Sequence, residues 1–161
     1  RHSTRRQRQM CIRDRLTAAG VSDRVFVLCR SWADPRFMDP ALDPSNRPPR
    51  ACYAGDPKRA NYGAAGLGVA STLRSWLNMW SLDHSPCRGE QHLGKITVPA
   101  LVIQADADTG VFPSDAAAIA DALASTDKKQ LTVPGDHYLL KPMSAREDTA
   151  KLIHEWVGSR F

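Results

Sequence analysis

Three short runs of apolar residues stand out along the chain. Residues 25–29 (VFVLC) and 100–104 (ALVIQ) are almost continuously apolar and rich in branched side chains, and residues 129–133 (KQLTV) form a weaker third run. Unbroken runs of this kind are typical of strands that are covered on both faces, as in a parallel sheet. The pattern therefore predicts an α/β fold with three parallel strands.

Apolar residues at helical spacing predict a helix between the second and third strands. Pro113 is favoured in a first helical turn, and Ala116, Ile119 and Leu123 follow on one face. Such a helix would form a right-handed crossover, which lets the two strands lie side by side and parallel.

A further helix is predicted near the end of the chain. Ser144 and Glu147 have the spacing of a capping box, in which each side chain bonds the free backbone N–H of the other residue. An apolar stripe suited to packing on the sheet follows. It consists of Ala150, Ile153, Trp156 and Val157.

Residues 30–94 have a different composition. They begin with prolines and glycines and end in a helical run, residues 71–82, that carries one broad apolar face. This face consists of Leu73, Trp76, Leu77 and Trp80. Core packing is the favoured interpretation, and a wall over a ligand pocket is the alternative. We therefore describe residues 30–94 as a cap-like insertion.

The net charge of +5 is confined to the first fifteen residues. Residues 1–15 contain six arginines and one aspartate, so the other 16 basic and 16 acidic groups balance to zero. Residues 10–15 (MCIRDR) look like a translated sequencing adapter, and we exclude 1–15 from fold reasoning as an artefactual leader. The alternative is a basic arm that binds phosphates. With a neutral remainder, neither nucleic acid nor membrane is an expected partner.

The four cysteines match no zinc or redox spacing. Scattered thiols fit a reducing compartment, so a cytoplasmic location is expected. No apolar run is long enough to span a bilayer, and no metal-binding cluster or phosphate-binding glycine loop occurs in the sequence. We therefore expect no cofactor and no metal.

The candidate chemistry lies where two predicted strands end. Asp108 follows the second strand and His137 follows the third. Neighbouring strands lie about 4.8 Å apart, and open parallel sheets bind ligands at the carboxyl ends of their strands. A carboxylate that bonds one imidazole nitrogen fixes the tautomer while the other nitrogen accepts a proton from a nucleophile.

At these residues the chain resembles the carboxyl-terminal part of the alpha/beta-hydrolase superfamily, specifically a bacterial esterase-type branch. The resemblance covers about the last two thirds of the chain and rests on PALVIQADAD, TLRSWLNMWSL, ADTGVFPSDA and PGDHYL. It implies that Asp108 is the triad acid and His137 the triad histidine. Asp106 is the competing acid. Asp136 is expected to face solvent or form a turn, and Tyr138 to pack or to orient substrate.

The family's Gly-x-Ser-x-Gly motif does not occur in the chain. Ser71 and Ser125 lack the strand-to-helix turn that presents such a nucleophile. We therefore expect residues 16–161 to be the carboxyl-terminal part of one partial alpha/beta-hydrolase domain, with the serine upstream, and to be inactive alone. The implied substrate is a small ester-like molecule. The alternatives are a non-catalytic module that binds a ligand or partner, and a dehalogenase-type hydrolase with an aspartate nucleophile.

Overall fold

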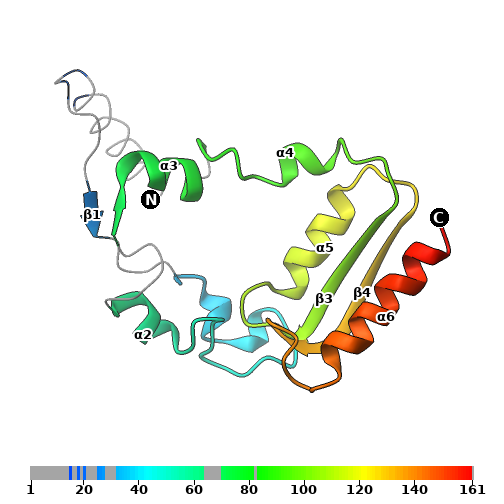
Figure 1. Cartoon of the computed structure of the whole chain (residues 1–161). Coiled ribbons are helices and arrows are strands. Elements are labelled where there is room, and N and C mark those ends of the chain that lie inside the picture. Colours follow the sequence, from blue (N-terminus) through cyan, green and yellow to red (C-terminus); the bar gives the residue numbers. More distant parts are fainter. Residues whose placement is uncertain are drawn as a thin grey trace. The chain divides into compact units, whose positions relative to one another are not determined.

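The computed structural model describes residues 25–27, 32–63, 70–81 and 83–160, together with Arg15, Ala18 and Gly20. The chain divides into two compact units (Figure 1). The first comprises Arg1–Ser31 and Asn61–Arg88, and the second comprises Trp32–Ala60 and Gly89–Phe161. Most of the leader and the end of the first predicted strand, Leu28 and Cys29, lie outside the described residues.

The first unit contains two short strands and a helix. Strand β1 (Val25–Val27) pairs with β2 (Ala70–Thr72), and α3 (Leu73–Trp80) follows β2 directly. The Thr72 hydroxyl caps α3 by accepting a hydrogen bond from the Ser75 amide at 3.1 Å. Leu73 and Leu77 are buried on the predicted apolar face, whereas Trp80 is 40% exposed.

The prediction of three parallel strands needs correction. Strand β1 is antiparallel to β2, and only β3 (Ala100–Ala107) and β4 (Lys128–Asp136) form a parallel pair among the described residues. Val25 and Val27 are 70% and 68% exposed, so β1 is not covered on both faces. A short run of apolar residues identifies an extended segment but does not specify its partner.

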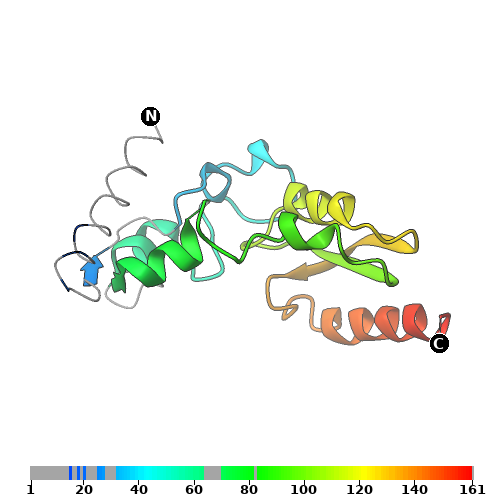
Figure 2. The ribbon, with the colours of Figure 1, turned by 90° about the horizontal axis from the view of Figure 1, so that it is seen from above.

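The second unit is a strand, helix, strand arrangement. Strands β3 and β4 are parallel and are connected by α5 (Pro113–Ala122), as predicted. Helix α5 packs on both strands and α6 (Ala145–Gly158) packs on β4. The two helices lie on opposite faces of the pair (Figure 2). The coarse α/β class is therefore confirmed for this unit.

The predicted capping box of α6 is not formed. Ser144 precedes the helix, but its backbone is already helical (φ −78°, ψ −13°) and its side chain makes no cap hydrogen bond. An N-cap residue normally has extended backbone, which lets its hydroxyl reach forward to the first turn. The Glu147 carboxylate instead pairs with Lys151 at 2.8 Å.

Residues 32–60 belong to the second unit, whereas residues 61–88 of the expected insertion belong to the first. Residues 32–60 contain the short helices η1 (Pro35–Phe37) and η2 (Pro40–Leu42), and α2 (Pro57–Tyr62) begins within them. A further short helix of this unit, α4 (Glu90–Leu93), precedes β3. The segment packs through a buried cluster formed by Trp32, Phe37, Cys52 and Phe112.

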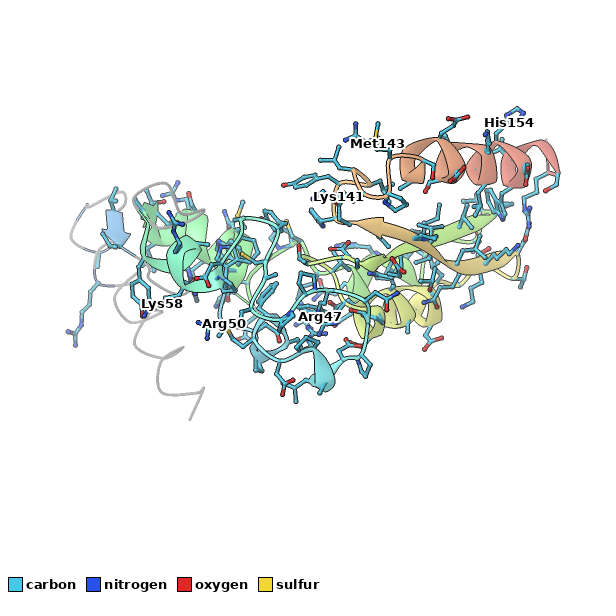
Figure 3. The ribbon with its side chains drawn as sticks, turned by 90° about the horizontal axis from the view of Figure 1, so that it is seen from below. Arg47, Arg50, Lys58, Lys141, Met143 and His154 are labelled. Carbon is cyan, nitrogen blue, oxygen red and sulfur yellow. The ribbon has the colours of Figure 1, made fainter. Side chains whose placement is uncertain are left out.

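Phe112 anchors residues 32–60 to the start of α5. Its side chain is 2% exposed, and the guanidinium groups of Arg36 and Arg47 lie 4.2 and 4.7 Å from the centre of its ring. Figure 3 shows Arg47 beside this helix. Asp43 adds polar bonds, accepting from the hydroxyl of Ser114 at 2.6 Å and from its amide at 3.2 Å. The segment is thus fixed against the loop that follows β3.

Across the described part of the chain, no helix combines the length and the apolar character needed to cross a membrane.

Candidate functional site

Asp108 is the first residue after β3 and sits in a tight turn. Its Oδ1 accepts hydrogen bonds from the backbone amides of Gly110 at 2.6 Å and Val111 at 3.0 Å. Aspartate favours such turns because its side chain can bond amides two or three residues ahead. The residue is buried, with 9% of its surface exposed, so the local sequence holds the carboxylate in one place.

His137 is the first residue after β4 and meets Asp108. Its Nδ1 lies 2.8 Å from Asp108 Oδ1. The strand register explains this meeting, because Ala107 pairs with Asp136 and the next residue of each strand leaves the sheet at the same edge. The structure therefore brings together the two side chains that the sequence selected.

The second ring nitrogen of His137, Nε2, has different surroundings from Nδ1. Among the described residues no hydrogen bond to Nε2 is found, and the His137 side chain is 26% exposed. A proton on Nδ1, donated to the carboxylate, leaves the lone pair on Nε2. This is the arrangement in which an imidazole accepts a proton from a nucleophile.

Aromatic rings surround the His137 imidazole. Tyr53 stacks on it, with ring centres 4.9 Å apart and planes 15° from parallel, and Tyr138 meets it edge-on at 4.8 Å. Trp32 in turn contacts Tyr53 edge-on at 4.4 Å. Burial raises the pKa of the Tyr53 hydroxyl, so that group stays neutral around neutral pH.

Gly110 provides the space that these rings occupy. A Cβ atom placed on Gly110 would lie 2.8 Å from Cε1 and Nδ1 of His137 and 2.9 Å from Cδ1 of Tyr53. These separations are shorter than any van der Waals contact allows, so a side chain here would displace a ring.

Asp106, the competing acid, has other partners. Its Oδ1 accepts from the backbone amide of Gly135 at 2.9 Å, and its Oδ2 accepts from the side-chain amide of Asn46 at 2.7 Å. The Asn46 backbone amide also donates to the Asp106 carbonyl at 2.8 Å. The Gly135 amide, opposed in part by burial and aided by Asn46, lowers the pKa of the Asp106 carboxyl. Asp106 therefore joins β3 to β4 and to residues 32–60.

Asp136 forms the turn after β4. Its Oδ1 accepts from the amides of Tyr138 at 3.1 Å and Leu140 at 2.8 Å, while Leu139 adopts a left-handed backbone with φ 53°. Tyr138 itself is 54% exposed. The bonds of Asp136 match the turn that the sequence predicted for it.

The two serines considered in the sequence are engaged elsewhere. The Ser71 hydroxyl donates to the Thr72 carbonyl at 3.1 Å in the first unit, and the buried Ser125 hydroxyl donates to the Asp127 carbonyl at 3.0 Å. Neither bonds to His137. The part of the chain that the structure describes also contains no group of three or more His, Cys, Asp or Glu side chains arranged to hold a metal ion.

Sequence reasoning missed Tyr53, Asn46 and Gly110. The first two reach the site from residues 32–60, which carry no periodic pattern, and nothing in the sequence places them beside β3. Gly110 had a signal, because a glycine two residues after an aspartate is typical of a tight turn. The glycine's contact with the imidazole could not be predicted from that signal.

Comparison of the chain with models of protein families, with curated proteins and with solved structures finds no match. The geometry of Asp108 and His137 therefore carries the functional argument by itself.

Proposed function

We propose that this chain is the carboxyl-terminal portion of a serine-type hydrolase that cleaves small ester-like molecules by acyl transfer. The observation that supports the proposal is the 2.8 Å contact between His137 Nδ1 and Asp108 Oδ1. The two residues lie at the carboxyl ends of adjacent parallel strands, where open α/β sheets place their ligand sites.

In this proposal His137 moves the proton of each half-reaction. Nε2 takes the proton from the serine hydroxyl as its oxygen attacks the ester carbonyl, and delivers it to the departing alcohol. It then takes a proton from water, which attacks the acyl-enzyme, and returns that proton to the serine as the acid leaves. Asp108 stays ionised throughout, holds the tautomer and stabilises the transient imidazolium.

The nucleophile and the oxyanion donors belong, in this proposal, to a part of the parent protein outside residues 16–161. The term parent protein here means the longer protein that would contain this chain. A serine at a strand-to-helix turn would have to present its hydroxyl to Nε2 of His137 within about 3.2 Å.

The test begins by sequencing the full open reading frame that encodes residues 16–161, so that the parent protein can be expressed. The parent protein is incubated with a fluorophosphonate probe, which labels a serine activated by a histidine, and assayed with p-nitrophenyl esters of short acids. His137→Ala should remove labelling and lower turnover by about 10⁴-fold or more. His154→Ala is the matched control, since this exposed residue lies on the outer face of α6 (Figure 3).

Three outcomes would contradict the proposal. They are a parent protein that neither labels nor hydrolyses esters, full labelling of the His137→Ala variant, and a labelled residue other than serine. An aspartate in place of the serine at the strand-to-helix turn of the parent protein would instead favour the dehalogenase-type alternative.

A further inference from the structure

The contact between Asp108 and His137 leaves one feature of the imidazole unexplained. A hydrogen bond at Nδ1 restrains only the distance from that atom to Asp108, so the ring can still pivot through coupled changes of its χ1 and χ2 torsions. Such a pivot would swing Nε2 away from a nucleophile while the hydrogen bond persisted. A second contact, on the face of the ring, is needed to fix its plane.

Tyr53 makes that contact. Its ring lies 4.9 Å from the imidazole centre and only 15° from parallel, so it covers one face of the imidazole. Stacked aromatic pairs stabilise each other beyond the burial of their surfaces, and an aromatic face also attracts the cation formed when an imidazole takes up a proton. The contact therefore suits both protonation states of His137.

Tyr53 is itself held in a fixed structure. Cys52 and Gly55 exchange backbone hydrogen bonds of 2.8 Å in both directions around it, and Gly55 has the left-handed φ of 97° that this tight turn requires. Cys52 is buried in the same cluster as Trp32, which contacts the Tyr53 ring edge-on at 4.4 Å. The turn from Cys52 to Gly55 and the Trp32 ring therefore hold Tyr53 in place.

Two further residues approach the imidazole closely. Gly110 approaches both rings so closely that a Cβ atom would lie 2.8–2.9 Å from each, and Tyr138 stands across the imidazole at 78°. The turn at Asp108 and residues 32–60 together form a slot for the imidazole. Phe112 and Asp106 anchor residues 32–60 to this site from two sides.

We infer that Tyr53 is a positioning residue, which fixes the plane of the His137 imidazole so that Nε2 faces the nucleophile. Its catalytic consequence rests on the proposed function. Residues 32–60 then act on the histidine itself, in addition to any role in covering a substrate.

The test compares Tyr53→Leu, Tyr53→Phe and the control Tyr62→Leu, whose native side chain is 61% exposed in the first unit. Leucine keeps apolar volume without a flat ring, whereas phenylalanine keeps the ring without the hydroxyl. The first readout is the NMR signal of the His137 Hε1 proton, assigned by its loss in His137→Gln. Tyr53→Leu should move this signal downfield, because the shielding ring is gone, while the other two variants leave it in place.

The second readout is ester hydrolysis by the parent protein. Tyr53→Leu should lower kcat about 10- to 100-fold with little change in KM, the loss typical of a misplaced catalytic group. Tyr53→Phe should restore most of that loss, and Tyr62→Leu should have no effect.

The two readouts separate the inference from the proposed function. An unmoved Hε1 signal in Tyr53→Leu overturns the inference, as does an equal loss of kcat in Tyr53→Phe, which would assign the effect to the hydroxyl. A wild-type parent without esterase activity, combined with a moved signal in Tyr53→Leu, would reject the hydrolase proposal and still support the fixed imidazole plane.

Discussion

Asp106 and Asp108 are separated by one residue at the end of β3, yet their carboxylates have different surroundings. Asp106 bonds the Gly135 amide with one oxygen and the Asn46 side chain with the other, so it joins three parts of the second unit. In Asp108 a single oxygen, Oδ1, accepts hydrogen bonds from two backbone amides of its own turn and contacts the His137 imidazole.

This difference separates a structural carboxylate from a candidate catalytic one. The partners of Asp106 are an amide of the adjacent strand and an asparagine, neither of which changes charge in the physiological range. The partner of Asp108 is an imidazole, a group that can take up and release a proton during a reaction. Each of the two aspartates follows an alanine in the sequence. Their different roles therefore depend on their hydrogen-bond partners in the fold.

The largest effect is expected from Asp108→Asn in the parent protein. The carbonyl oxygen of asparagine can keep the hydrogen bonds of the turn, but the residue carries no charge to stabilise the imidazolium, and turnover should fall by about 10⁴-fold. Steady-state kinetics with a p-nitrophenyl ester measure the loss. Asp106→Asn is the matched variant, and a larger loss of turnover there than in Asp108→Asn would move the candidate acid to Asp106.

Gly110→Ala tests the imidazole slot without removing a polar group. The added methyl group would lie 2.8 Å from the His137 ring, so the ring must shift and kcat should fall by about 100-fold. Gly158→Ala is the control, because a Cβ atom there would meet nothing within 4 Å. Equal kinetics for the two variants would show that the close approach of Gly110 to His137 is not needed.

Asp106→Asn should mainly affect stability. An asparagine can accept from Gly135 or from Asn46, but not with both terminal atoms, so one donor loses its acceptor. Loss of a half-buried acceptor of this kind costs about 1–3 kcal/mol in the free energy of unfolding. Urea denaturation at pH 7 measures this cost. A stability equal to that of the wild type would mean that water, or an Asn46 amide turned by 180°, replaces the lost bond.

The smallest effect is a pH dependence of that difference. The pKa of Asp106 is lowered in the folded protein, so its carboxylate stabilises the fold above the unfolded value of about 3.9. This contribution is lost as the pH falls through the lower, folded-state pKa. The stability gap between wild type and Asp106→Asn should therefore shrink below about pH 4, when urea midpoints are compared between pH 3 and pH 7. A constant gap would mean that the charge of Asp106 contributes nothing.

The sequence predicted the second unit better than the first for a physical reason. The apolar run at residues 100–104, the proline-led helix and the run at residues 129–133 are consecutive, and a short crossover permits few arrangements of two strands. The meeting of Asp108 and His137 follows from that topology. In contrast, β1 pairs with a distant strand through three residues, and its pattern contained no information about that partner.

The rest of the site depends on contacts that local patterns do not encode. Asn46 and Asp106 are 60 positions apart, and Tyr53 reaches His137 from a segment rich in proline. Those contacts arise from packing around Phe112, which the sequence presents only as one apolar residue before a helix. The capping box at Ser144 failed for a related reason, since its spacing was right but the backbone before α6 was not extended.

The most direct test of the account is the tautomer of His137, measured by 15N NMR on protein labelled at its histidines, with His137→Gln for assignment. Neutral His137 is expected to carry its proton on Nδ1, with Nε2 unprotonated, and Asp108→Ala, which removes the acceptor, should abolish this preference. A proton on Nε2 in the wild-type protein, or a tautomer unchanged by Asp108→Ala, would contradict the claim that Asp108 orients His137 for proton transfer.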